Sequence, residues 1–154
     1  MAVQFQERLE QAARASDWRA AVLYTNDGVL ANYNYTGDDA ERAALVNNFR
    51  RRHPDDPDLE NADGDVSDVV RDGFEVSGTH YEVHRIHGHA DQVYYGRALQ
   101  PGYRLGAGVL RIDLGEAGCA FLAATWELPN LSAKCVAHMR RFGARVRATL
   151  VESD

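Results

Sequence analysis

Apolar positions near the start of the chain recur at helical spacing and then give way to β-type runs. From Phe5 to Ala13 an apolar residue returns every three or four positions, which predicts a short amphipathic helix over residues 3 to 15. The runs "WRAAVLYT" and "VLANYNY" flank the turn from Asn26 to Gly28. Because Asp-Gly tolerates the positive φ of a tight turn, these runs predict a β-hairpin.

A second helix follows the hairpin. The stretch "TGDDAERAALVNNFRRR" begins with Thr36 as a candidate N-cap, has acids in its first turn and arginines in its last turn. The Pro54 and Pro57 stretch ends it, and a run of acids follows. This run does not fit a calcium loop, because Ala62 and Val69 stand where oxygen ligands are required, so we expect a solvated acidic loop.

Strand-like runs dominate the middle of the chain, and a helix ends it. The runs are "VVRDGFEV", "THYEVHRI", "QVYYGRAL", "AGVLRIDL" and "CAFLAATW", and their short links predict an antiparallel meander. The last helix has one apolar face, which consists of Leu131, Cys135, Met139, Phe142, Val146 and Leu150. Gly143 lies inside this helix at a cost of about 1 kcal/mol relative to alanine. We therefore predict an α+β fold, a single antiparallel sheet with the N- and C-terminal helices packed on it.

Length and charge limit the possible classes of protein. The 154 residues fit a single domain over 1–154. No apolar run is long enough to cross a bilayer and the N-terminus has no signal-peptide core, so we expect a cytoplasmic protein. The net charge of −6 argues against general nucleic-acid binding. Residues 55–68 hold seven acids and no base, whereas residues 134–147 hold five bases and no acid, which predicts a basic C-terminal face.

Histidines and cysteines are the candidate metal ligands. His80 and His84 share one face of a predicted strand and His87 takes the other, so these side chains do not converge, and only Asp91 adds a nearby carboxylate. We interpret the histidines as an ordinary hairpin rim and expect no metal and no cofactor. Cys119 and Cys135 lie in apolar runs without C-x-x-C spacing, which predicts buried free thiols. Trp18 and Trp126 are expected in the core.

From Gly73 onward the chain resembles the profilin family. "GFEVSGTHYEV" is similar to the family's glycine-rich turn and following strand. "YYGRALQPGYRLGAGVLRIDLGEAGCAFLA" resembles its next three strands, and "AKCVAHMRRF" resembles the start of its final helix. Roadblock and longin domains share the layout but have about three strands between their last two helices, whereas this chain has room for four or five.

The resemblance implies a binding protein rather than an enzyme, one that holds an actin or actin-like monomer and regulates filament assembly. Carried over by position, the implied contacts are His80, Arg85, Arg97, Lys134 and His138. A small-molecule or metal-sensing domain on a similar sheet is the alternative, and it predicts a concave cavity with convergent polar groups.

Side-chain alternation extends the expected partner surface. Tyr95 shares a strand face with Arg97, and Val109 shares one with Arg111, opposite the core-like Leu110. Tyrosine and arginine are enriched at interface hot spots, so we expect these residues to face a partner. Arg85 has the parity of core residues and reaches solvent only if a bulge or the strand's end intervenes.

The resemblance also implies proline-rich peptide binding by aromatic residues of the two terminal helices. Phe5 and Phe142 are the candidate platforms here. Arg8 stands where the family has its second N-terminal aromatic, and Arg145 or Arg147 stands near the C-terminal one, so we predict weak or absent poly-proline affinity. The basic helix suits acidic phospholipid headgroups, as in some relatives, or is simply a solvated arginine face.

Overall fold

A computed structural model describes residues 2–49, 72–87, 91–100, 102–128 and 132–152. The helices are α1 (Ala2–Ser16), α2 (Asp39–Phe49), the 3-10 turn η1 (Gly115–Ala117) and α4 (Ser132–Glu152). The strands are β1 (Trp18–Thr25), β2 (Gly28–Tyr33), β3 (Phe74–Val76), β4 (Thr79–Tyr81), β5 (Arg85–His87), β6 (Gln92–Arg97), β7 (Leu105–Asp113) and β8 (Cys119–Glu127). Within these residues no helix is both long and apolar enough to cross a membrane.

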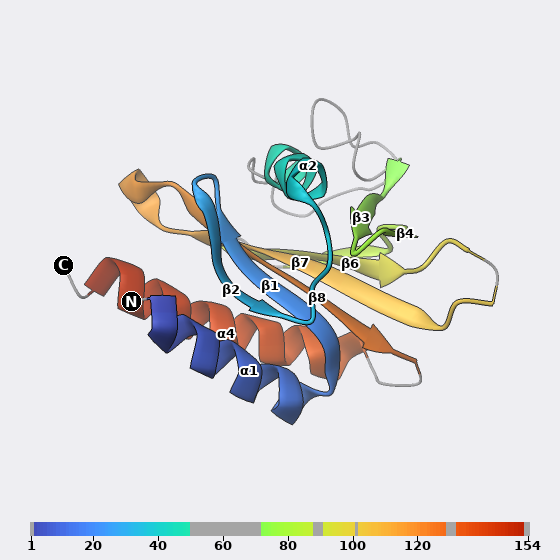
Figure 1. Cartoon of the computed structure of the whole chain (residues 1–154), viewed down its shortest axis with the longest axis horizontal. Helices are drawn as coiled ribbons and strands as arrows, with labels where there is room; N and C mark the ends of the chain where they lie inside the picture. Colours follow the sequence, from blue (N-terminus) through green and yellow to red (C-terminus); the bar gives the residue numbers. More distant parts are fainter. Residues whose placement is uncertain (1, 50–71, 88–90, 101, 129–131, 153–154) are drawn as a thin grey trace.

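Six strands form one antiparallel sheet in the order β2-β1-β8-β7-β6-β5. Strands β5 to β8 form a meander, and β8 returns beside β1. The predicted five-run meander is wrong at its start, because β3 and β4 do not join this sheet. Strands β3 and β4 form a separate two-stranded hairpin. Figure 1 shows three layers: α1 and α4 below the sheet, and α2 with the β3–β4 hairpin above it. The predicted α+β fold, with both terminal helices on an antiparallel sheet, is confirmed.

One side of the sheet, which we call the helix face, is covered by α1 and α4. The α4 residues Cys135, Met139, Phe142 and Val146 are all buried there, as their spacing predicted. Strand residues complete this core, among them Trp18, Leu23, Val93, Leu110, Ile112, Leu122 and Trp126. Gly143 lies directly over Leu110, and a Cβ at this position would overlap the leucine side chain. The glycine therefore allows close approach of helix and sheet.

The opposite side, which we call the hairpin face, is covered by α2 and the β3–β4 hairpin. Aromatic rings fill it: Phe49 packs edge-on against Phe74 and Tyr94, at centroid distances of 5.5 and 4.9 Å. Tyr24 stacks on Phe121. Its other buried residues include Val22, Leu45, Val76, Tyr81, Val109 and Ala123. Consecutive residues along β1 thus point into two different cores, so the centre of the sheet is buried on both sides.

The start of α2 differs from the sequence prediction. The side chain of Asp38 accepts a hydrogen bond from the Glu41 backbone N–H at 2.8 Å, which makes Asp38 the N-cap. The expectation that Thr36 caps this helix is therefore wrong. Both residues suit the role chemically, but the chain enters the helix two residues later. The predicted arginine-rich end of this helix, the prolines and the acidic loop lie outside the described residues.

The predicted strand "THYEVHRI" is interrupted between β4 and β5. Tyr81 bridges to Ala98, whereas Arg85 pairs with Tyr95, so the register along β6 shifts by one residue. Gly96 permits this shift, because a Cβ there would overlap the carbonyl oxygen of Glu82. Strict alternation would have turned Arg85 toward the core, and after this interruption its side chain is exposed to solvent.

The outer edge of β2 is closed by a side chain. The Gln6 amide of α1 donates to the Asn32 carbonyl oxygen at 2.8 Å and accepts from the Asn32 N–H at 2.9 Å. The Asn32 side chain in turn exchanges two hydrogen bonds with the backbone of Tyr35. These contacts fix α1 against the edge strand and satisfy backbone groups that have no neighbouring strand.

Candidate functional site

The exposed edge of the sheet beside α4 brings three of the sequence-predicted residues together. Arg85 on β5 pairs directly with Tyr95 on β6, and Arg97 follows two positions later on the same face. Both arginines are exposed, and Tyr95 is half-buried against the helix-face core. Neither guanidinium has an ion-pair partner within the described ranges.

Two large apolar side chains extend this area beyond the end of β6. Leu99 is 53% exposed and Tyr103 is 54% exposed, on either side of the turn that leads into β7. The turn is held in place, since the Leu99 N–H donates to the His80 carbonyl oxygen at 2.9 Å. We call Arg85, Tyr95, Arg97, Leu99 and Tyr103 the edge surface. Exposed aromatic, leucine and arginine side chains in one area are typical of protein interfaces.

A charged contact ties α4 to the start of the same edge. The Arg147 guanidinium contacts the Asp91 carboxylate and donates to the Asp113 carbonyl oxygen at 3.0 Å. The Asp91 carboxylate also accepts from the Asp113 N–H at 3.0 Å. These bonds connect β6, β7 and α4, and they hold the strands that carry Tyr95 and Arg97 at a fixed position beside the helix.

Two residues expected on this surface lie on the other side of the sheet. Val109 is completely buried in the hairpin-face core, so the expectation that it faces a partner is wrong. The Arg111 side chain is only 11% exposed and lies 3.7 Å from the Asp113 carboxylate. The alternation within β7 was assigned correctly, but both of its faces are covered. A β7 side chain that points away from the helix-face core therefore lies in the hairpin-face core and does not reach solvent.

The remaining predicted contacts are dispersed. His80 lies on β4 and lines a hollow above the hairpin face. Lys134 lies 3.4 Å from the Asp17 carboxylate at the end of α1, and the His138 ring contacts the Ser16 hydroxyl. Burial, together with the positive charges of Arg141 and Lys134, lowers the pKa of His138 below 6.5. These residues do not join the edge surface.

The two candidate aromatic platforms are inside the protein. Phe5 is 2% exposed and Phe142 is 4% exposed, and both pack between the terminal helices and the sheet. In these positions neither ring offers a face on which a proline could stack.

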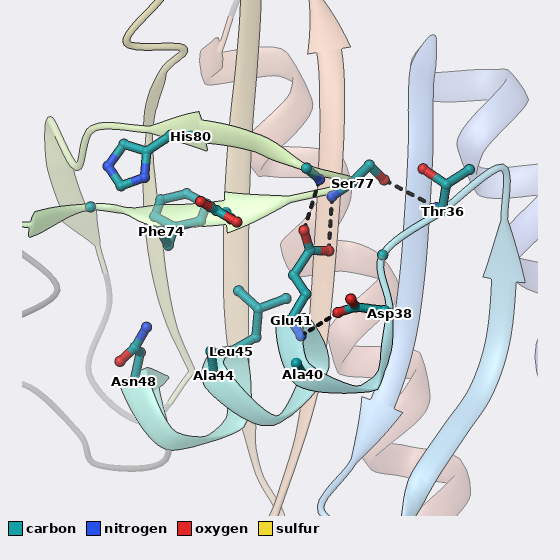
Figure 2. A pocket seen from close by; sticks show the side chains of 14 residues that line it. Thr36, Asp38, Ala40, Glu41, Ala44, Leu45, Asn48, Phe74, Ser77 and His80 are labelled. Atoms are coloured by element: carbon teal, nitrogen blue, oxygen red, sulfur yellow. Dashed lines mark hydrogen bonds between the residues drawn. The ribbon is translucent and has the colours of Figure 1, made fainter.

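A hollow of about 580 Å³ lies between α2 and the β3–β4 hairpin. In Figure 2 the Glu41 carboxylate points from α2 to the hairpin turn. It accepts hydrogen bonds from the backbone N–H groups of Ser77 and Gly78, at 2.9 and 2.8 Å, and from the Tyr35 hydroxyl. Burial and the hydrogen bond to Glu41 raise the pKa of Tyr35 well above its ordinary value. The carboxylate thus fastens the hairpin to the helix.

This hollow does not favour the small-molecule alternative. Its Glu41 carboxylate is engaged in the fold, and its Asp38 carboxylate caps α2. It opens to solvent, and His80 and the buried Phe74 are among the residues that line it (Figure 2). A ligand site is expected to be concave, mainly apolar and supplied with polar groups that converge on the ligand. Here the Glu41 and Asp38 carboxylates bind backbone N–H groups instead.

The described residues contain no cluster of three or more histidine, cysteine or acidic side chains that could hold a metal ion. His84 contacts the Glu82 carboxylate at 3.1 Å. The His87 side chain and His89 lie outside what the structure describes. The thiols are free, as predicted; Cys135 is buried and Cys119 is half-buried. Burial raises the pKa of both thiols, that of Cys135 to about 11, so both are protonated at neutral pH.

Sequence reasoning missed Leu99, Tyr103 and Glu41. Leu99 and Tyr103 flank Pro101-Gly102, a recognisable turn, and large apolar residues beside an exposed turn were an available signal. Glu41 gave no such signal, because its partners at Ser77 and Gly78 are 36 and 37 residues away.

Comparison with known proteins supports the fold. No protein-family model and no curated protein sequence matches the chain. Among solved structures, profilin II of Acanthamoeba castellanii aligns with a TM-score of 0.62 and 16% identity, over 94% of this chain and 97% of that chain. Profilin IA aligns with a TM-score of 0.63 and 13% identity over 94% and 98%, and profilin IB with 0.58 and 14% over 89% and 90%. The chain is therefore profilin-like in fold.

Proposed function

We propose that this protein binds the monomer of actin, or of an actin-like filament-forming protein, and thereby regulates filament assembly. The observation that carries the proposal is the edge surface on a profilin-like fold. It combines Arg85 and Arg97, which have no ion-pair partner among the described residues, with Tyr95, Leu99 and Tyr103 at a sheet edge that is fixed to α4.

The composition of the edge surface defines what the partner must offer. Leu99 and Tyr103 need an apolar recess, and Arg85 and Arg97 need carboxylates at its rim. A partner with this pattern removes apolar area from water and pairs both guanidiniums. Steric occupation of a monomer surface that filament contacts also use would then slow assembly.

Arg97→Glu tests the proposal. The exposed position allows charge reversal with a stability change within about 0.5 kcal/mol, while one arginine–carboxylate contact at the interface becomes repulsive. We expect monomer affinity to fall at least tenfold. The measurement is the assembly of pyrene-labelled actin, or of a cognate actin-like protein, with increasing amounts of wild type or variant.

Arg14→Glu is the matched control, because it reverses an exposed arginine in the last turn of α1, outside the edge surface, and changes the net charge equally. It should inhibit assembly as the wild type does. Undiminished inhibition by folded Arg97→Glu would show that the edge surface is not the binding site. No effect of the wild-type protein on assembly, and no complex with the monomer, would contradict the function itself.

A further inference from the structure

The seam between α1 and α4, on the outer side of the molecule, carries a second charged feature. Two adjoining hollows of about 570 and 190 Å³ follow it and share Ala12, Ala15 and Arg145. We call the pair of hollows the interhelical groove. Figure 1 shows the two helices side by side on the face of the sheet away from α2.

The floor of the interhelical groove consists of small residues. Ala12, Ala15 and Ala148 leave space where larger side chains would close the seam between the helices. Phe142 also borders the groove, but its ring is buried in the core below. These small residues leave room for a peptide backbone, and none of the described lining residues offers an exposed aromatic ring for stacking.

The walls of the groove are basic. Arg8 comes from α1, and Arg141 and Arg145 come from successive turns of α4. Of the described residues that line it, none is acidic. Two acids of the α1 region have other partners: the Asp17 carboxylate faces Lys134, and the Glu10 carboxylate accepts from the Gln6 amide.

The three arginines differ in how they are held. The Arg8 guanidinium donates to the Thr149 hydroxyl at 3.2 Å, which fixes it across the seam. Arg141 and Arg145 are exposed, and within the described part of the chain neither guanidinium has a hydrogen bond or an ion pair. The lowered pKa of His138 has Arg141 among its causes, which is consistent with positive potential along the groove.

We propose that the interhelical groove binds an acidic peptide segment, with carboxylates paired to Arg8, Arg141 and Arg145. Guanidinium groups bind carboxylates through two parallel hydrogen bonds, which makes arginine suited to this role. From His138 to Thr149 the helix rises about 16 Å, the length of roughly five residues of extended peptide. This activity is separate from the edge surface, which lies beyond the opposite side of α4.

A fluorescein-labelled hexaglutamate peptide is the probe. Its anisotropy, measured against the full-length protein in 50 mM salt, should rise saturably, and the affinity should fall as salt is raised. Arg145→Glu should weaken binding at least tenfold, because this residue borders both hollows. Arg104→Glu reverses an exposed arginine on the β6–β7 connection and should bind the peptide as the wild type does.

Ala15→Leu separates a seated peptide from diffuse charge attraction. It fills the groove floor, favours the helix and leaves all charges unchanged, so it should also weaken binding. If Arg145→Glu does not fold, the binding measured with Ala15→Leu still tests the proposal. Equal loss with Arg104→Glu, unchanged binding with Ala15→Leu, or no saturable binding would each overturn the proposal. So would binding of phosphatidylserine vesicles or poly-proline in place of hexaglutamate.

Discussion

The two faces of the sheet are covered by different means. On the helix face, two long helices bury a continuous apolar core to which α4 contributes five buried residues. On the hairpin face, an 11-residue helix and a two-stranded hairpin cover a mainly aromatic core, and one carboxylate joins them. The difference teaches that apolar periodicity predicts the first kind of packing, whereas the second depends on polar contacts between distant residues. The following predictions test this contrast.

The largest effect is expected on the helix face. Trp126 is fully buried and its indole lies against Gly106 and Gly108. Trp126→Ala should lower the free energy of unfolding by about 3–5 kcal/mol, because it removes buried area and leaves a cavity. Urea denaturation measures the loss, with exposed Val29→Ala as the control near zero. A loss below about 1 kcal/mol would contradict the packing described here.

A smaller and more local effect is expected at Glu41. Glu41→Ala removes the acceptor for Ser77, Gly78 and Tyr35 and should cost about 2 kcal/mol. The Ser77 and Gly78 amides should exchange hydrogen faster, while amides of β7 and β8 keep their protection. Glu41→Gln keeps one acceptor and should give an intermediate result. Unchanged exchange at Ser77 and Gly78 would show that other contacts hold the hairpin.

The thiols allow the two faces to be compared within one molecule. Burial raises the pKa of Cys135 from 9.0 to about 11, so its stabilising contribution is fully present below pH 9 and is lost as pH rises toward 11. Unfolding free energy should therefore fall more between pH 9 and 11 in the wild type than in Cys135→Ala. At pH 9, iodoacetamide should modify half-buried Cys119 before Cys135. The reverse order of labelling would be inconsistent with this placement.

The smallest expected effect concerns His138. Its pKa is lowered, so its contribution to stability is present above pH 6.5 and is lost as pH falls below that value. The melting temperature of the wild type should drop slightly between pH 7.5 and 5.5, and that of His138→Gln should drop less. Equal drops would mean that other groups cause the pH dependence.

Patterns within single elements predicted much of the fold. A helix repeats its apolar face every three to four residues, so apolar spacing predicted which side of each terminal helix is buried. Leu9 of α1 and Met139 and Phe142 of α4 are buried as this spacing predicted. The hairpin from β1 to β2 followed from its Asp-Gly turn. The interruption before Arg85 could not be predicted from the local sequence alone. It depends on Gly96, which lies on the neighbouring strand β6.

The candidate site was less predictable from the sequence. Alternation assigned Val109 and Leu110 to opposite faces correctly but carried no information on what covers each face. The family resemblance implied that His80, Lys134 and Arg97 share one surface. In the structure His80 lies on β4, and Lys134 lies on the side of α4 that faces α1, away from Arg97. Such relations depend on how distant elements pack, which local periodicity does not report.

The Gln6 amide at the edge of β2 has a consequence for self-association. A strand with free N–H and C=O groups is a template for another chain, and a protein at high concentration can then polymerise through its own sheet. By occupying both backbone groups of Asn32, Gln6 acts as a substitute for the missing neighbour. At Asn32 the edge of β2 therefore offers no free backbone group with which a strand of another chain could pair.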